Sequence, residues 1–263
     1  MGVGGQNLFD VLVSADGAAR LPRLGGMARP NGVVIVSERY WAFAARDGSL
    51  REGEMPAAAS RAARLPLLRG LARLASSLTP LFRGGGVARR RERIVLAAAA
   101  VLPFAFFFAP AYVANAMGIV LTVGLIGFLF RGRTLFLHGA EHRAIAAVES
   151  RQLVSTWEGS ARPSRFALRC GTNFAALAIP VTVFADRVFP LDFPIVTPLV
   201  VTLLSLALTM ELWLAVQASA SRFSRVLLLP GLGLQRLTTR EPALDETRIA
   251  LTAVASVLRR ELA

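Results

Sequence analysis

The chain contains very few of the residues that usually build cross-linked or metal-bound sites. Its 263 residues include a single cysteine, Cys170, two histidines and no lysine, so all 30 basic side chains are arginine. One cysteine excludes an intramolecular disulfide, and nothing in the sequence argues for an oxidising compartment. We attribute the missing lysine to a GC-rich genome rather than to a chemical preference for guanidinium groups.

The first 20 residues also lack the features of a signal peptide. They are mixed in character and contain several glycines, without a basic start, an apolar stretch or a cleavage site. Insertion into a membrane is therefore expected to depend on internal apolar segments. Residues 1–31 as a whole carry few large apolar side chains and are predicted to form a loosely ordered lead-in.

Apolar residues, in contrast, are abundant. They make up 54% of the chain, and the mean hydropathy is +0.52, which is higher than a soluble domain normally reaches. The net charge is +13, yet the arginines form short clusters beside apolar runs, as the positive-inside rule describes for membrane proteins. The partner indicated by this pattern is a lipid bilayer with anionic headgroups, not a nucleic acid. A second copy of the chain, in a homo-oligomer, is a further candidate partner.

Two apolar stretches predict two short transmembrane hairpins. Residues 94–130 would extend roughly 55 Å as one helix, against an apolar bilayer core of about 30 Å, so we expect two helices joined near Ala114 and Asn115. The second pair is predicted over 171–185 and 193–218. Whether 171–185 crosses the bilayer or only dips into it is left open by the sequence.

Basic residues at the ends of these stretches orient the predicted hairpins. Arg131 and Arg133 close the first pair, and Arg222 and Arg225 close the second. The positive-inside rule then places these ends in the cytoplasm. The chain is thus predicted to be a multi-pass protein of the cell membrane with both termini cytoplasmic.

Three smaller elements are predicted outside the hairpins. Residues 32–45 are rich in β-branched and aromatic side chains and precede Asp47-Gly48, which indicates a small cytoplasmic β-hairpin. Residues 57–82 have the spacing of a basic amphipathic helix, which lies either in the headgroup region or against the membrane bundle. The tail from Glu241 onward has acidic residues early and arginines late, which is typical of a soluble helix.

The predicted fold class is therefore mainly α and integral membrane, with two short transmembrane helical hairpins (about four spans), a small cytoplasmic β-hairpin and amphipathic helices. This organisation places a cytoplasmic segment between the two hairpins, at the membrane face. The expected segments are a cytoplasmic N-terminal region at 1–92, the first hairpin at 93–133, the cytoplasmic segment at 134–169, the second hairpin at 170–221 and a cytoplasmic C-terminal helix at 222–263.

The segment between the hairpins holds both histidines of the chain, in the pattern His138-Gly-Ala-Glu141-His142. We expect a helix over 135–152, and because residues four apart share one helix face, both imidazoles can reach one metal ion. Glu141 precedes the second histidine and is placed to polarise a metal-bound water, as in the inverted zinc peptidases. The alternative is a polar interfacial helix whose histidines bind headgroups or carbonyls.

A zinc site of this kind needs at least one more protein ligand. Cys170 stands where the second hairpin begins, at the predicted depth of the histidines, and a thiolate is a soft ligand. Glu211 lies inside an apolar stretch, where an ionisable residue is a functional candidate by default. Glu149 shares the histidine face, but seven residues beyond His142 place it roughly 10 Å along a straight helix. A small buried thiol and a structurally paired carboxylate are the alternatives for Cys170 and Glu211.

Several short motifs are spread over the chain: Gly-Met-Ala-Arg-Pro at 26–30, Leu-Pro-Leu-Leu-Arg-Gly at 65–70, His-Gly-Ala-Glu-His at 138–142 with Glu149, Arg-Cys-Gly-Thr at 169–172, Glu211, Pro-Gly-Leu at 230–232 and Leu-Gln-Arg-Leu-Thr-Thr-Arg-Glu-Pro at 234–242. Through them the chain resembles the YqhQ family of bacterial membrane proteins, which have been predicted to be metal-dependent enzymes. The family usually has His-Pro directly before Arg-Cys-Gly-Thr, where this chain has Ala167 and Leu168. The resemblance implies the fold and the site location, with Thr172 as a secondary candidate, and no settled activity.

The motif at 234–242 has two interpretations. In the structural one, Thr238 and Thr239 cap the following helix through their hydroxyls. In the functional one, Gln235 and Arg240 fold over the metal site as a lid or an anion clamp. The structural interpretation is the one that we favour from the sequence.

Three functions are compatible with these residues. The first hypothesis is a membrane-embedded metal-dependent hydrolase at the cytoplasmic face, acting on a peptide or a lipid-derived substrate. The alternative is a non-catalytic membrane scaffold or lipid-binding factor, and a transporter ranks third because few polar residues lie in the predicted spans. The predicted ligands of the divalent ion, zinc by ligand type, are His138, His142 and either Cys170 or Glu211, and the predicted general base is Glu141.

Overall fold

The structure of the chain is a computed structural model, and it divides into two compact units. Each unit is built from segments that are far apart in the sequence. The first comprises Met1–Ala57, Phe130–Ala167 and Gln235–Ala263, and the second comprises Ala58–Leu129 and Leu168–Leu234. The residues that the structure describes are 7–55, 65–82, 86–88, 90–105, 109–129, 131–188, 193, 196–219, 221 and 226–263.

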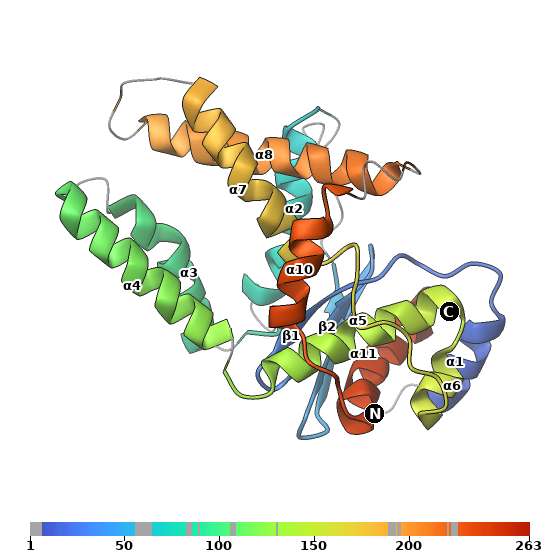
Figure 1. The fold of residues 1–263 in the computed structure, drawn as a ribbon. Coiled ribbons are helices and arrows are strands. Elements are labelled where there is room, and N and C mark those ends of the chain that lie inside the picture. The colour runs from blue at the N-terminus through green and yellow to red at the C-terminus, as the bar shows by residue number, and fades with distance from the viewer. Residues whose placement is uncertain are drawn as a thin grey trace. The chain divides into compact units, whose positions relative to one another are not determined.

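A four-stranded antiparallel sheet belongs to the first unit (Figure 1). Its register places Gly26 of the first strand opposite Ile35 of the second. The turn between the last two strands places Gly48 at a φ of 83°, which glycine adopts at little steric cost, and the Asp47 carboxylate accepts the Ser49 N–H at 2.9 Å. In spatial order the strands are β1 (Gly25–Arg29), β2 (Gly32–Val36), β3 (Tyr40–Ala45) and β4 (Leu50–Glu54).

The predicted hairpin turn at Asp47-Gly48 is confirmed between β3 and β4, and the β-branched and aromatic residues of 32–45 form β2 and β3, where they suit a half-buried pleated surface. The sheet is larger than the small hairpin predicted, because it has four strands. The prediction of a loosely ordered lead-in at 1–31 is wrong for its described part, which contains the helix α1 (Leu8–Gly17) and β1.

Two long helices pack on the sheet of the first unit. They are α5 (Thr134–Ser150) and α11 (Leu244–Leu262), and both contact β2 and each other. The helices predicted over 135–152 and from Glu241 onward are thus confirmed. Burial of a large apolar side chain contributes about 1.5–3 kcal/mol, so this core fixes α5 firmly. Its fully buried members include Leu12, Val33, Ile35, Leu137, Leu153, Leu251, Val254 and Leu258.

A short helix, α6 (Leu153–Glu158), follows α5 in the first unit. The backbone N–H groups of Leu153 and Val154 donate to the two carboxylate oxygens of Asp16, at 2.9 and 3.0 Å. Asp16 therefore satisfies N–H groups that the first turn of a helix leaves without intrahelical partners. This contact ties α6 to the end of α1.

The second unit is helical where it is described. The helices α7 and α8 pack along each other, and the ring of Phe174 meets the Trp213 ring edge to face, with centroids 6.3 Å apart. The helix α2 packs on α8 at Gly70, where a Cβ atom would lie 2.7 Å from Met210 Cβ. The elements are α2 (Leu68–Phe82), α3 (Arg90–Ala105), α4 (Ala111–Leu129), α7 (Gly171–Val188), α8 (Val196–Ala218) and the start of α10 (Leu229–Thr238), which continues into the first unit.

The predicted four-span membrane fold is wrong. Within the described residues, α8 alone is long and apolar enough to cross a bilayer, and Tyr112–Gly124 is a shorter apolar stretch. Charged residues lie inside two of the other helices, Arg90 and Glu92 in α3 and Asp186 and Arg187 in α7, which shortens the apolar length available to face lipid. The chain is a mixed α/β protein, not a four-span integral membrane protein.

Details of the predicted hairpins change as well. The turn expected near Ala114 and Asn115 is wrong, because both residues lie within α4. Arg222 and Arg225, expected to close the second pair, lie outside the described residues. The amphipathic helix predicted over 57–82 is described from Leu68 on, as α2.

Candidate metal centre

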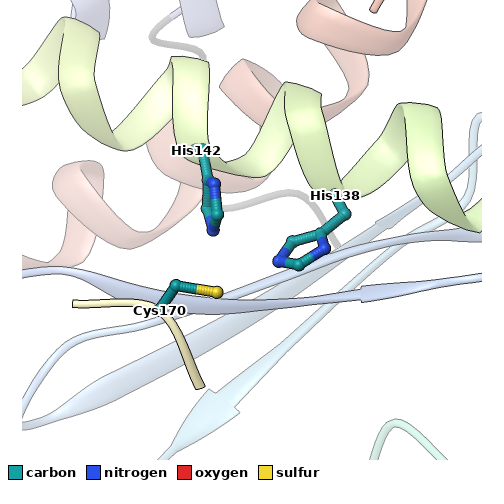
Figure 2. Close-up of side chains that lie close together, drawn as sticks. All are labelled: His138, His142 and Cys170. Carbon is teal, nitrogen blue, oxygen red and sulfur yellow. The ribbon is translucent and has the colours of Figure 1, made fainter. Parts of the chain in front are cut away.

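The two histidines project from one face of α5. His138 and His142 are four residues apart, and their ring centroids lie 4.5 Å from each other in an edge-to-face arrangement. Figure 2 shows both rings on the same side of the helix. The helical spacing that brings the two imidazoles together is a local property, which is why the sequence predicted it.

Each imidazole is oriented by a backbone carbonyl. The Nδ1–H group of His138 donates to the Thr238 carbonyl at 2.8 Å, and the Nδ1–H group of His142 donates to the Arg165 carbonyl at 2.7 Å. Because a carbonyl oxygen only accepts, the proton of each neutral ring is on Nδ1 and the lone pair is on Nε2. This is the arrangement by which proteins orient metal-binding histidines.

Burial keeps both rings neutral. His142 is 2% exposed, and its pKa falls to about 4 because burial penalises the charged form and His138 lies close by. Burial also lowers the pKa of His138, against the raising effect of its hydrogen bond to Thr238. Both imidazoles are therefore in the form that binds a metal ion at neutral pH.

The Nε2 atom of His142 lacks a hydrogen-bond partner among the described residues. The atom is also buried. A buried polar atom left in this way costs about 1–3 kcal/mol. An ion held by this nitrogen would supply the missing interaction.

Cys170 is the third candidate ligand. It follows Ala167 by three residues, so its Cα lies no more than about 11 Å from that of Ala167, and Ala167 is held in the first unit by both polar groups of the Gln235 side chain. The Cys170 Sγ atom and one ring nitrogen from each histidine lie within 4.8 Å of one another, and Figure 2 draws the three side chains. Tetrahedral ligands of zinc lie about 3.5 Å apart at bond lengths of about 2.0–2.3 Å.

Hydrogen bonds from Thr172 also suit Cys170 to this role. The Thr172 hydroxyl donates to Sγ at 3.2 Å, and the Thr172 backbone N–H donates to it at 3.4 Å. Both bonds stabilise a charged sulfur, which is the form that binds metals. Thr172, a secondary candidate from the sequence, therefore supports the thiol.

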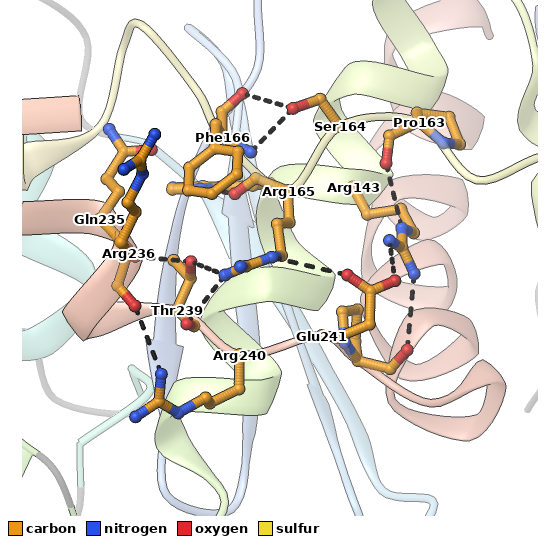
Figure 3. Close-up of polar contacts among 12 residues, drawn as sticks. Arg143, Pro163, Ser164, Arg165, Phe166, Gln235, Arg236, Thr239, Arg240 and Glu241 are labelled. Atoms are coloured by element: carbon orange, nitrogen blue, oxygen red, sulfur yellow. Dashed lines mark hydrogen bonds and ion pairs between the residues drawn. The ribbon is translucent and has the colours of Figure 1, made fainter. Parts of the chain in front are cut away.

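Two arginines connect the segment that contains Arg165 to the segment that follows α10 (Figure 3). The Arg143 side chain is 8% exposed and donates to the Glu241 carboxylate at 2.6 Å and to the Pro163 carbonyl at 3.1 Å. Arg165 forms an ion pair with the same carboxylate at 3.5 Å and donates to the Thr239 carbonyl at 2.9 Å and hydroxyl at 2.6 Å. The segment that presents the Arg165 carbonyl is thus tied to the segment that follows α10.

That second segment also lies unusually close to α5. The Arg240 N–H donates to the Leu135 carbonyl at 2.9 Å. At Gly139, a Cβ atom would lie 2.1 Å from the Arg240 carbonyl oxygen. Only a residue without a side chain permits this approach, and it places the Thr238 carbonyl beside His138.

Glu141 faces the sheet. It is 5% exposed, and a Cβ atom on Gly26 of β1 would lie 2.7 Å from its Cγ. Burial raises the pKa of Glu141 to about 8, against the lowering effect of a hydrogen bond from the Ala28 backbone. Its carboxyl group is therefore largely protonated at neutral pH, and its predicted role as general base stays a prediction.

The other candidates from the sequence have different surroundings. In the second unit, the Glu211 carboxylate accepts the Leu67 N–H at 3.0 Å and the Arg69 Nε–H at 2.9 Å. Glu149 is exposed at the end of α5. The Arg240 guanidinium donates to the Arg236 carbonyl at 3.3 Å. The Glu211 carboxylate thus has structural partners of its own within the second unit.

The predicted capping role of Thr238 and Thr239 is wrong. The N-terminus of α11 is capped by Glu246, whose carboxylate accepts the Ala243 N–H at 2.6 Å. The Thr239 hydroxyl instead donates to the Gln235 carbonyl at 2.7 Å. Gln235 is fully buried, and its side chain is bonded to Ala167.

Comparison with known proteins identifies the family. The model of the family described as "Protein of unknown function (DUF1385)" matches residues 113–260, which is more than half of the chain. The chain belongs to this family. The match includes the histidines, Cys170 and the segment after α10.

A curated relative agrees with this assignment. The chain is 29% identical over 156 residues to "Uncharacterized protein YqhQ" of Bacillus subtilis (strain 168). The alignment covers 54% of this chain and 47% of that protein, so the chain spans about half the length of the relative. The resemblance to YqhQ inferred from the motifs is confirmed, and no solved structure matches the chain.

Sequence reasoning missed the groups that orient the ligands. Backbone carbonyls, such as those of Arg165 and Thr238, exist in every residue and leave no signal in a sequence. Arg143 gave no signal either, because arginines are mostly exposed and one directly after His142 is unremarkable by type. A usable signal was Gly139 between the histidines, since a glycine inside a helix weakens it and usually has a packing reason.

Proposed function

We propose that the protein is a metal-dependent enzyme whose divalent ion is held by His138 Nε2, His142 Nε2 and Cys170 Sγ. The observation that carries this proposal is the pair of Nδ1 hydrogen bonds to backbone carbonyls, together with the buried, unpartnered Nε2 of His142. A histidine in a packed core usually satisfies both ring nitrogens. The buried Nε2 of His142, without a hydrogen-bond partner in the described part of the chain, suits a metal better than it suits packing.

The ligand set favours zinc and a reactive rather than a structural site. Two imidazoles and a thiolate suit zinc in type, and three protein ligands leave a fourth position for water or substrate. When bound, such an ion lowers the pKa of its water to about 7 and polarises carbonyl groups, which is the chemistry of hydrolysis. We therefore propose a hydrolase.

Glu141 is the residue that we propose for proton transfer. It is a buried carboxyl group next to His142 in the sequence, held by Ala28 and packed against Gly26. No other acidic residue lies between the histidines. Replacement by glutamine keeps the shape and the hydrogen bond to Ala28 and removes the capacity to accept a proton.

We further propose that α8 attaches the protein to a bilayer. The support is the length and apolar character of Val196–Ala218 and the excess of arginine, which attracts anionic headgroups. A peptide or a lipid-derived substrate would suit an enzyme attached in this way. A non-catalytic scaffold is the alternative, and it requires neither a bound ion nor Glu141.

Metal content tests the proposal. The full-length protein, purified in detergent, is expected to carry one zinc ion per chain and to lose it on treatment with a strong chelator. The variants His142→Ala and Cys170→Ser are expected to lose the ion, whereas Ser150→Ala, an exposed site on the same helix, keeps it. A wild-type protein without metal, or equal metal in all three variants, would remove the basis for the enzyme.

Glu141→Gln then separates catalysis from structure. The variant is expected to keep the ion and to lose hydrolysis of peptide or ester substrates in a screen in which the wild type is active. If it loses neither, Glu141 has no part in the reaction.

A further inference from the structure

The Gln235 side chain is a buried amide with an unusual pair of partners. It is fully buried, its Oε1 atom accepts the Ala167 N–H at 2.9 Å, and its Nε2–H group donates to the Ala167 carbonyl at 2.8 Å. One side chain therefore satisfies both polar groups of one backbone residue. Such a reciprocal pair holds a segment in one register and one orientation, as a neighbouring β-strand would.

Ala167 lies in the segment that serves His142 and carries Cys170. The carbonyl that orients His142 belongs to Arg165, two residues before Ala167. Cys170 follows three residues after it. The Gln235 hydrogen bonds to Ala167 therefore restrict the orientation of His142.

Gln235 also begins the last turn of the segment that serves His138. Its backbone carbonyl accepts the Thr239 N–H at 2.9 Å and the Thr239 hydroxyl at 2.7 Å. Thr238, within this turn, supplies the carbonyl for His138. The Arg165 guanidinium also connects the two segments directly, by donating to the Thr239 hydroxyl at 2.6 Å, as Figure 3 shows.

We propose that Gln235 is a positioning residue of the metal centre, which joins the two backbone segments that orient His138 and His142. Gln235 binds no metal and contacts no ligand atom in this role. It determines how the two imidazoles are oriented toward the ion. This inference rests on the proposed function, because it concerns the same ion.

A purely structural role makes a different prediction. If Gln235 only fills the interior, its replacement lowers the stability of the protein and leaves the folded fraction with the same site. If Gln235 positions the ligands, the folded protein binds metal more weakly and with altered geometry. Affinity and spectrum distinguish these cases, and stability alone does not.

Cobalt(II) is the probe, because its absorption reports both coordination number and a bond to sulfur. The full-length protein is stripped of metal and titrated with Co²⁺ against a competing chelator. Gln235→Leu removes both hydrogen bonds at similar volume. Gln235→Glu keeps the acceptor for the Ala167 N–H and, when ionised, loses the donor to the Ala167 carbonyl.

Two variants serve as controls. Gln152→Leu makes the same change at an exposed glutamine of the first unit. Leu153→Ala removes a fully buried core side chain outside the site and lowers stability without touching either segment. Both are expected to bind Co²⁺ as the wild type does.

Gln235→Leu is expected to bind Co²⁺ about 10–100-fold more weakly, the usual effect of losing a group that orients a metal ligand. Its sulfur-to-cobalt charge-transfer band is expected to weaken, and Gln235→Glu is expected to fall between it and the wild type. Wild-type affinity and spectrum in Gln235→Leu overturn the proposal. If that variant does not fold, the same result in Gln235→Glu overturns it. Absence of Co²⁺ binding in the wild type is the separate failure of the proposed metal site.

Discussion

Gly139 lies in the middle of α5, between the two histidines, and its replacement by alanine sets two physical effects against each other. Alanine is the better helix former, and glycine in a helix interior costs about 0.5–1 kcal/mol relative to it. On helix propensity alone, Gly139→Ala stabilises the protein.

The packing around Gly139 predicts the opposite sign. The new Cβ would lie 2.1 Å from the Arg240 carbonyl oxygen and 3.2 Å from Pro242 Cδ, whereas ordinary contacts begin at 3.4 Å. The atom in the way belongs to the backbone, so no side-chain rotation relieves the clash, and the segment must move by roughly 1 Å in a close-packed region. Overpacking of this kind costs about 1–3 kcal/mol. The expected net effect is a destabilisation of about 1–2 kcal/mol.

The same movement reaches the metal centre. The displaced segment carries the Thr238 carbonyl that orients His138 and the Arg240 N–H that binds the Leu135 carbonyl. Loss of an orienting partner typically lowers metal affinity about 10–100-fold. Gly139→Ala is therefore expected to weaken Co²⁺ binding by that factor although it changes no ligand.

Chemical denaturation of the metal-free protein and Co²⁺ competition measure the two effects. Gly233→Ala is the matched control, because it is also a glycine inside a helix and no heavy atom lies within 4 Å of its Cβ position. It is expected to gain about 0.5–1 kcal/mol and to keep the metal affinity. A Gly139→Ala protein that is stabilised like the control, with unchanged affinity, would refute the close approach of the two segments.

Two further predictions concern the first unit. Gly26→Ala places a methyl group 2.7 Å from Glu141 Cγ, whereas the same change at the neighbouring Gly25 meets only Val36 Cγ2 at 3.5 Å. In denaturation experiments we expect the free energy of unfolding to fall by about 1–3 kcal/mol for Gly26→Ala and by less than about 0.5 kcal/mol for Gly25→Ala. Equal effects would contradict the packing of Glu141 on β1. At Glu261, burial raises the pKa, but the hydrogen bonds from Arg39 and Ser37 and the charge of Arg39 together outweigh it and hold the pKa below its usual range. The stabilisation by ionised Glu261 is present above pH about 4.5 and is lost as the pH falls through the lowered pKa. In Glu261→Gln we therefore expect the free energy of unfolding to fall less steeply as the pH is lowered below about 4.5. The same pH dependence in the variant and the wild type would contradict this role of Glu261.

Local patterns in the sequence were sufficient for the helices of the first unit. The spacing of His138 and His142 depends only on helix geometry, and α5 has the predicted range within a few residues. The acidic start and basic end of α11, at Asp245 and Arg259 among others, likewise reflect the helix dipole. Helix spacing and terminal charges can therefore be predicted without knowing which elements pack against the helix.

The sheet edge and the membrane fold required non-local information. β1 begins Gly25-Gly26, which have poor strand propensity, and forms because it pairs with β2 and leaves room for Glu141. Hydropathy counted apolar residues without regard to their environment. Many of them, such as Leu251 and Val254, pack in the α/β core of the first unit, so the high mean hydropathy of the chain does not by itself require four membrane spans.

The contacts around the histidines also determine which positions tolerate change. Arg165 and Thr238 orient the imidazoles through carbonyl oxygens, which any residue at those positions supplies. Gly139 acts by having no side chain, and Gln235 by having one that both donates to and accepts from the same residue. The positions most restricted in residue type therefore include two that bind no metal. A search of the sequence for histidine, cysteine and acidic residues finds the proposed ligands and misses the residues whose packing and hydrogen bonds hold the orienting segments.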